Sequence, residues 1–250
     1  MTITHQDDLE GLKKIGRIVA NTMQSMAAAM EPGMTTRELD DIGQDLLQRE
    51  GAVSAPRATY NFPGVTCISV NEEIAHGIPG NRRLADGDLV NIDVSASLDG
   101  YFADTGASFC LGPAQQSLQE LCRDGRSATQ IGIAKVRHDK PLAGIGNAIG
   151  AFASKRGYTL IRNLASHGVG RALHEAPEEI PTWPTNGDTR RINNGLVLTV
   201  EPFLSRGGRW AKSGIDDDWT LYSEPAAPVV QYEHTVVATH RGAIVVTLPG

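Results

Sequence analysis

Four carboxylates and one imidazole stand in segments where an unpaired charge needs a reason. Asp93 and Asp104 lie on either side of Asp99-Gly100, a dipeptide that favours a two-residue hairpin turn. Such a turn places Ser95 opposite Asp104, so Asp93 becomes the diagonal neighbour of Asp104 on one face. Close carboxylates repel, and each is costly to bury without a partner. On spacing alone, a solvent-exposed face explains this pair equally well.

Three later residues favour a metal site over a surface location. Glu201 follows the apolar run 196–198 and precedes Pro202, and Glu233 interrupts the strand-like segment 229–238. Isolated acids in apolar strands usually have a cation or a proton to justify them. His167 precedes a glycine, and a single histidine in that setting is more often structural than a ligand. Together, however, four carboxylates and one imidazole favour a hard, oxygen-rich site that suits two divalent ions.

The elements that must position these residues follow a repeated order. An apolar stripe with spacings of three and four predicts a helix over 9–30, and a capping box at Thr35 and Glu38 opens a second helix that stops at Gly51. About a hundred residues later, helices are expected near 116–136 and before Gly157. Each pair of helices leads into strands. We therefore predict a single α/β domain over 1–250 with two related halves, roughly 1–112 and 113–250, that share one sheet.

Composition excludes several other classes of protein. The chain has 250 residues, 40% of them hydrophobic and 21% charged, which argues against disorder. Its formal net charge of −6 argues against nucleic-acid binding as the main activity. The polar N-terminus lacks a signal-peptide core, and no apolar run is long enough to span a membrane. Three cysteines without a CxxC pair fit a reducing compartment, so we expect a cytoplasmic protein.

At these residues the chain resembles the bacterial type I methionine aminopeptidases of peptidase family M24. The resemblance extends over nearly the whole chain, and its five motifs occur in the family's order. They are Cys-Ile-Ser-Val-Asn-Glu-Glu-Ile-Ala-His-Gly-Ile-Pro at 67–79, Asp-Leu-Val-Asn-Ile-Asp-Val at 88–94, His-Gly-Val-Gly at 167–170, Thr-Val-Glu-Pro at 199–202 and Gln-Tyr-Glu-His-Thr at 231–235. The resemblance implies the pita-bread fold, in which two pseudo-symmetric halves share a mainly antiparallel sheet with helices outside.

The resemblance also implies a catalytic centre with two divalent ions, whether cobalt, manganese, iron or zinc. Asp104 and Glu233 would bridge the ions, Asp93 would chelate one, and His167 with Glu201 would complete the other. A bridging hydroxide would attack the peptide bond after the initiator methionine, with Glu201 as the general base. The physiological metal cannot be read from the residues.

Four further residues carry implied roles toward the substrate. His76 would donate to the scissile nitrogen or stabilise the tetrahedral intermediate, and His174 would bond the carbonyl oxygen. Phe62, Cys67 and Trp219, together with His76, would line an apolar pocket for the methionine side chain. Without the surrounding motifs, each histidine would be read as structural and Cys67 as a small buried apolar residue.

The sequence departs from the family pattern at the substrate entrance. Thr59 and Phe62 stand where tyrosines are common, and Ser166 replaces the usual glycine before His167. The stretch 178–191 is also irregular. None of these changes touches an implied metal ligand, but they leave the preference among substrates open.

Two alternative functions remain beside methionine removal. A prolidase or aminopeptidase P of the same fold uses a similar set of ligands, although such chains normally carry an additional N-terminal domain. A non-enzymatic pita-bread binding protein is the second alternative, although such relatives typically lose ligands. The resemblance implies peptides and nascent chains with an N-terminal methionine as substrates, transient ribosome contact and a monomer. No membrane or nucleic-acid partner is expected.

Overall fold

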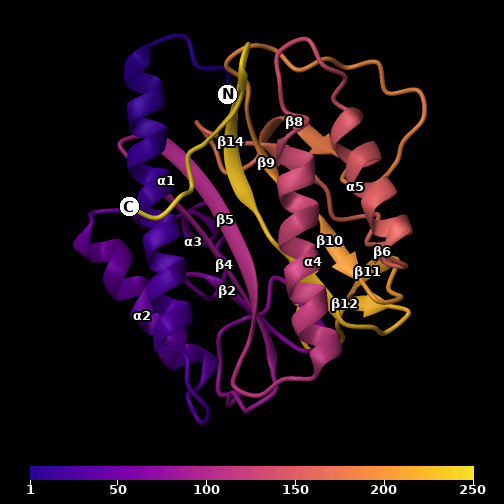
Figure 1. Cartoon of the computed structure of the whole chain (residues 1–250). Coiled ribbons are helices and arrows are strands. Elements are labelled where there is room, and N and C mark those ends of the chain that lie inside the picture. The colour runs from indigo at the N-terminus through magenta and orange to yellow at the C-terminus, as the bar shows by residue number, and fades with distance from the viewer.

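The computed structural model describes residues 1–250 as an α/β protein with its longest helices on one side of the strands (Figure 1). Helices α1 and α2 lie over one half of the molecule, and α4 and α5 lie over the other. The helices are α1 (Gln6–Ala29), α2 (Thr36–Arg49), α3 (Ala55–Tyr60), α4 (Gln116–Ile133) and α5 (Gly144–Lys155). No helix is both long and apolar enough to cross a membrane.

The helices begin and end where local sequence signals predict. The expected stripe of α1 is buried, with Leu12, Ile15 and Val19 fully inaccessible to solvent. At the start of α2, the hydroxyl of Thr35 accepts from the backbone N–H of Glu38, whose carboxylate accepts from the backbone N–H of Thr35. This reciprocal pair satisfies two donors that the first helical turn leaves free.

The strands form four antiparallel sheets. In the first sheet, β4 (Leu89–Leu98) pairs with β1 (Val53–Ser54), β2 (Cys67–Val70) and β5 (Tyr101–Cys110). In the second, β10 (Phe203–Ser205) pairs with β6 (Thr159–Leu160) and β13 (Val229–Gln231), and in the third, β12 (Leu221–Glu224) pairs with β3 (Glu73–Ala75) and β11 (Trp210–Ser213). The fourth sheet has the strand order β15 (Gly242–Val245), β14 (His234–Thr239), β9 (Val197–Val200), β7 (Ser166–Gly168), β8 (Glu175–Ile180).

Backbone hydrogen bonds between these sheets join the N-terminal and C-terminal parts of the chain. The N–H of Glu233 donates to the carbonyl of Gly106 at 2.8 Å, and the N–H of Phe102 donates to the carbonyl of Gly170 at 2.8 Å. An isolated bridge also pairs Ala107 with Tyr232. The predicted antiparallel sheet is therefore present, although its pairing is interrupted between the halves.

The β4–β5 hairpin has the predicted register. Ser95 pairs with Asp104, and Leu98 pairs with Tyr101, which leaves a two-residue turn at Asp99-Gly100. Both turn residues have positive φ, +53° at Asp99 and +79° at Gly100. Positive φ at both central residues matches the right-handed twist of the strands in a type I′ turn.

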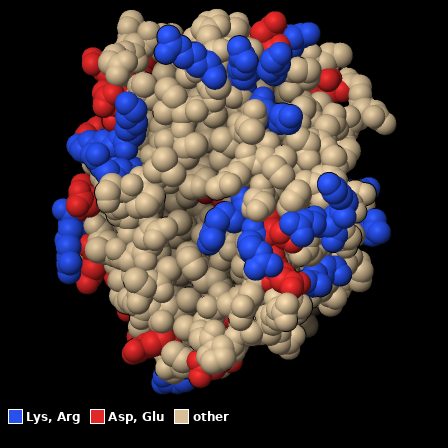
Figure 2. Space-filling model, in the orientation of Figure 1, with Lys and Arg blue, Asp and Glu red and all other residues tan.

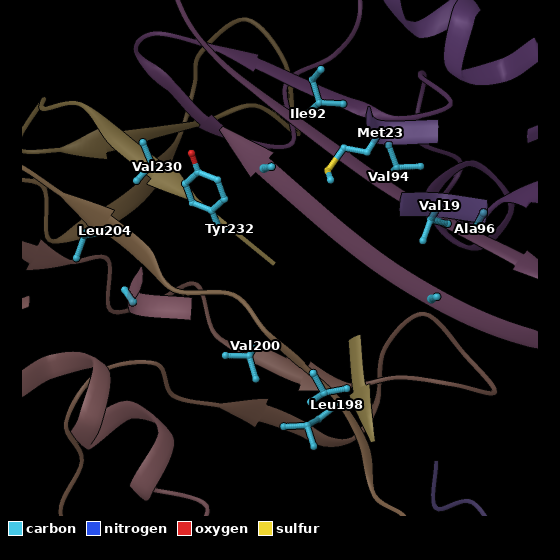
Figure 3. Packing of buried hydrophobic residues seen from close by; sticks show 14 of the residues in the cluster. Val19, Met23, Ile92, Val94, Ala96, Leu198, Val200, Leu204, Val230 and Tyr232 are labelled. Atoms are coloured by element: carbon cyan, nitrogen blue, oxygen red, sulfur yellow. The ribbon is translucent and has the colours of Figure 1, made fainter. Parts of the chain in front are cut away.

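The core lies between the helices and one face of the strands (Figure 3). Ile92 and Val94 of β4 are fully buried in the same cluster as Val19 and Met23 of α1. Since successive side chains of a strand point to opposite faces, Asp93 points away from α1. Val200 and Tyr232 extend the same core under the second half.

No Lys or Arg residue is buried, whereas several acidic residues are. Figure 2 shows Lys and Arg interspersed with Asp and Glu, with one mixed group over the middle of the α4 side. Arg123, Arg156 and Arg206 surround a hollow of about 380 Å³ there, together with Glu120 and Asp124. The acids partly neutralise the arginines, which agrees with a surface that is not dominated by positive charge.

The structure corrects the sequence prediction in three places. The single strand expected over 229–238 divides into β13 and β14, because Tyr232 and Glu233 turn to bond with β5. The short helix α3 was not expected before the substrate entrance. The β11–β12 hairpin was not expected either.

Candidate active site

Side chains from both halves meet on the face of the strands opposite α1 and α4. Asp104, His167 and Glu233 each offer a ligand atom, and these three atoms lie within 4.8 Å of one another. Nε2 of His167 is 3.5 Å from Oε1 of Glu201 and 4.0 Å from Oδ2 of Asp104. Gln231 joins the fourth carboxylate to this group, because its Nε2 donates to both Asp93, at 3.2 Å, and Glu233, at 2.8 Å.

The four carboxylates are poorly compensated by the protein itself. Burial raises the pKa of Asp93 to about 6 and that of Glu201 to about 8. Burial, followed by repulsion from neighbouring carboxylates, raises the pKa of Asp104 and of Glu233 well above the usual range. Oδ1 of Asp104 and Oε1 of Glu233 are buried without any hydrogen-bond partner. Buried acceptors of this kind are rare unless a cation or a proton satisfies them.

The imidazole of His167 is neutral and is oriented so that it can bind a metal ion. Nδ1 of His167 lies 3.0 Å from the carbonyl oxygen of Gly168. A carbonyl only accepts, so Nδ1 carries the hydrogen and Nε2 presents its lone pair to the carboxylates. Burial, with a smaller contribution from the nearby His174, lowers the pKa of His167 to about 3. The donor set of four carboxylates and one neutral imidazole fits divalent metal ions.

Gln231 is a site residue that sequence analysis missed. Its Oε1 accepts from Nδ2 of Asn91 at 2.8 Å, which orients the amide so that the NH₂ group faces the carboxylates. A Cβ at Gly106 would overlap the Gln231 side chain, so the glycine makes room for it. The signal was available, since Gln231 and Glu233 share one face by strand alternation.

Two hydroxyl groups support Glu201. Thr199 donates to Oε1 of Glu201 at 2.8 Å and accepts from the backbone N–H of His167 at 3.1 Å. Oγ of Ser166 accepts from the backbone N–H of Glu201 at 2.9 Å. Ser166, which departs from the family pattern, is therefore a fully buried acceptor that ties β7 to the end of β9.

Of the residues expected to hold the methionine side chain, Cys67 lies beside this group, and Phe62 and Trp219 contact each other. Cys67 pairs with Asp93 across the β2–β4 ladder, and burial followed by the Asp93 charge raises the pKa of its thiol. Phe62 is buried and meets Trp219 edge to face, with ring centroids 5.3 Å apart. The left-handed Asn61, at φ +58°, ends α3 immediately before Phe62.

His76 and His174 lie at the solvent-accessible side of the site. His76 has φ +54°, a conformation that costs a non-glycine residue about 1–2 kcal/mol and often marks a functional position. Burial lowers the pKa of both imidazoles, and the nearby His174 lowers that of His76 further. Each side chain keeps solvent access while neighbouring atoms displace much of its hydration, which fits a recess. The ring centroid of His174 is 4.0 Å from that of His167.

Tyr60 is a second residue that sequence analysis missed. Its hydroxyl oxygen lies 2.7 Å from Nδ1 of His174. The departures from the family pattern point to Thr59 and Phe62 at the entrance, whereas the side chain that contacts His174 is that of Tyr60. No periodicity identifies that contact, because it joins residues 114 positions apart.

A comparison with protein-family models agrees with this geometry. The model of Metallopeptidase family M24 matches residues 10–240. The chain therefore belongs to metallopeptidase family M24, and the predicted family and pita-bread fold are confirmed. A metallopeptidase needs a metal site, and the buried group around Asp104, His167 and Glu233 is the candidate for it.

Within the family, the chain is similar to proteins named methionine aminopeptidase. It is 45% identical to methionine aminopeptidase 2 of Bacillus subtilis, with 99% of each chain covered. It is 44% identical to a methionine aminopeptidase of Staphylococcus epidermidis, with 99% of this chain and 98% of the relative covered. The crystal structure of methionine aminopeptidase from Rickettsia prowazekii superposes with a TM-score of 0.94 at 32% identity, covering 99% of this chain and 100% of that one.

The prolidase from Pyrococcus furiosus shares the fold alone. It superposes with a TM-score of 0.79 at 21% identity, and the match covers all of this chain but 66% of the prolidase. The additional length in that protein agrees with the expectation that prolidases carry a further domain.

Proposed function

We propose that this chain hydrolyses the peptide bond after an N-terminal methionine. The observation that carries the proposal is the buried group of four carboxylates and His167, with two unpartnered oxygens. The relatives named methionine aminopeptidase, which match over nearly their whole length, support the same activity.

Asp93, Asp104, His167, Glu201 and Glu233 would hold two divalent ions. Two ions are proposed because four carboxylates supply more negative charge than one ion neutralises. When bound, the ions would polarise the scissile carbonyl and acidify the attacking water. Manganese, iron, cobalt and zinc all suit a set of oxygen ligands with one imidazole, so the residues leave the choice among them open.

Glu201 is proposed as the general base. Thr199 occupies one carboxylate oxygen, Oε1, and fixes the orientation of the group. Burial raises the pKa of this carboxyl group to about 8 without metal, and nearby cations would favour its ionised, proton-accepting form. A general base positioned in this way contributes about 10²- to 10⁴-fold in rate.

His76 and His174 are proposed as neutral donors to the reacting peptide. Both imidazoles have lowered pKa values, so each is uncharged at neutral pH and carries one N–H. The Tyr60 hydroxyl engages Nδ1 of His174, which leaves Nε2 to face the substrate. A donor held in place before reaction stabilises developing negative charge without reorganisation.

Phe62, Cys67 and Trp219 are proposed to select methionine. Phe62 and Trp219 offer an edge-to-face pair of rings, and Cys67 offers a small apolar wall. A thioether is unbranched and polarisable, and its contacts with aromatic rings are favourable by about 0.3–1.5 kcal/mol. A β-branched or charged side chain would fit this surface less well.

Further features of the proposal rest on the resemblance to the family. The substrates would be nascent chains in the cytoplasm, met through transient contact with the ribosome, by an enzyme that acts as a monomer. The division of the domain into related halves near residue 112 is also retained as a proposal.

Peptide hydrolysis tests the activity directly. The metal-depleted protein would be resupplied with Mn²⁺, Fe²⁺ or Co²⁺ and given Met-Gly-Met-Met, Met-Ala-Ser, Gly-Pro and Leu-Gly-Gly. We expect metal-dependent release of methionine from the first two peptides only. Cleavage of Gly-Pro would instead assign the chain to the prolidase activity, and bound metal without cleavage of any peptide would favour a binding protein.

A further inference from the structure

Two thiols meet where the end of β5 lies close to α4. Cys110 is the last residue of β5, and Cys122 lies in the second turn of α4. Their sulfur atoms are 3.8 Å apart, and both residues are half-buried at the edge of the main core. The third cysteine, Cys67, is buried at the candidate active site and has no thiol partner.

The separation and accessibility of this pair suit covalent closure. A disulfide bond is about 2.05 Å long, so the two sulfur atoms need to approach each other by about 1.8 Å. Partial exposure admits a small oxidant. Burial, followed by repulsion from Cys110, raises the pKa of Cys122 to about 12. Cys110 is therefore the better candidate for the first attack on an oxidant, with Cys122 as the resolving thiol.

We propose that Cys110 and Cys122 form a modification site at which a hydroperoxide produces an intrachain disulfide between β5 and α4. In the first step the Cys110 sulfur is oxidised by two electrons to a sulfenic acid, the O–O bond of the oxidant breaks, and the oxidant is reduced to water or an alcohol. In the second step the Cys122 sulfur forms the S–S bond, the S–O bond breaks, and the hydroxyl leaves with the Cys122 proton as water.

The cross-link bears on the segment that carries two active-site side chains. Tyr232 stands between Gln231 and Glu233, and it contacts one group on β5 and two groups on α4. Its hydroxyl donates to the carbonyl of Ser108, its carbonyl accepts from Thr129 at 2.7 Å, and the Arg126 guanidinium lies 5.1 Å from its ring centroid.

A displacement of α4 toward β5 therefore changes the packing around Tyr232. Tyr232 belongs to the buried cluster against which Cys110 and Cys122 pack. We expect the oxidised form to differ from the reduced form in the protection of the backbone around residues 229–235. This inference does not depend on which peptide the protein cleaves.

The test is treatment of the full-length metal-loaded protein with hydrogen peroxide, followed by mass spectrometry of the intact chain and of a non-reducing digest. We expect loss of two hydrogens, one peptide pair joined through Cys110 and Cys122, and a fall from three titratable thiols to one. Dithiothreitol should restore all three. Hydrogen exchange of the oxidised and reduced forms should differ at residues 229–235.

Two matched variants make the result decisive. Cys122→Ser removes the resolving thiol with little change in volume, so Cys110 should then accumulate oxygen adducts without the cross-link. Cys67→Ser should form the cross-link as the unchanged protein does. Oxygen adducts on both Cys110 and Cys122 in the unchanged protein, a disulfide between two chains, or a cross-link to Cys67 would each overturn the proposal.

Discussion

The hydroxyl oxygen of Tyr60 lies 2.7 Å from Nδ1 of His174, and the two ring centroids are 5.5 Å apart. Tyr60 is the last residue of α3 on the first half of the chain, whereas His174 follows β7 on the second half. The contact therefore joins the two halves at the entrance of the site. Because an imidazole has two nitrogens with different roles, this bond decides which of them is free to meet a substrate.

Removal of the Tyr60 hydroxyl should weaken catalysis more than binding. The net free-energy contribution of one hydrogen bond is about 0.5–1.5 kcal/mol. If this bond is needed in the transition state, Tyr60→Phe is expected to lower kcat about 2- to 10-fold with a smaller change in KM. Steady-state hydrolysis of Met-Gly-Met-Met measures both constants. The side chain is 43% exposed, so the variant should keep its fold.

An imidazole nitrogen signal distinguishes positioning from a general structural effect. Nitrogen-15 NMR of His174 should report one dominant tautomer in the unchanged protein and a mixture in Tyr60→Phe. Thr59→Ala, which changes the exposed neighbouring residue, is the matched control and should leave both the spectrum and kcat unchanged. An unaltered His174 spectrum in Tyr60→Phe would remove Tyr60 from any positioning role.

Glu201→Gln should separate metal binding from turnover. The amide keeps an oxygen that can contact a cation but cannot accept the proton, so we expect kcat to fall by about 10²- to 10⁴-fold. Metal content of the purified protein, measured by mass spectrometry of the elements, should remain near that of the unchanged protein. Turnover at the original rate would refute the assignment of Glu201 as the base.

Gln231→Leu should weaken metal binding without touching a ligand. The leucine has a similar size but cannot donate to Asp93 or Glu233, so both carboxylates lose orientation. Loss of such a supporting hydrogen bond typically lowers metal affinity about 10- to 100-fold. Competition with a fluorescent chelator measures the change.

The control for that variant is Gln130→Leu, a substitution of the same type on α4 away from the carboxylates. If Gln231→Leu and Gln130→Leu bind metal equally well, the amide of Gln231 has no part in holding the site.

The sequence predicts local elements well because their signals are local. The Asp99-Gly100 turn and the Thr35 capping box depend on residues close in the chain, and both occur in the structure as expected. Strand alternation then places Asp93 and Asp104 on one face. The family resemblance supplies the order of the remaining ligands, which periodicity alone leaves open.

Long-range side-chain contacts are where prediction from the sequence fails. The link from Asn91 to Gln231 spans 140 positions, and that from Tyr60 to His174 spans 114. Neither belongs to a periodic pattern, so packing of the whole chain decides them. The split of the strand 229–238 has the same origin, because bonds to β5 outweigh the tendency of one segment to remain a continuous strand.

The stability of the metal-free protein should fall as pH rises from 7 to 8. Glu201 and Asp93 have raised pKa values in the folded state, about 8 and about 6, whereas unfolded acids titrate near about 4. The folded state therefore binds more protons in that window, and ionisation destabilises it. His167 acts with the opposite sign, because its pKa is lowered to about 3 in the folded state and acidification below about pH 6.5 therefore destabilises the fold. Its contribution to stability is nearly complete at pH 7.

Calorimetry of the chelated protein should show a lower Tm at pH 8 than at pH 7. The decrease should be weaker in Glu201→Gln, and added Mn²⁺ should give a higher Tm with little pH dependence. A Tm of the chelated protein that stays constant or rises between pH 7 and 8 would mean that the carboxylates are not held in a protonated, low-dielectric group.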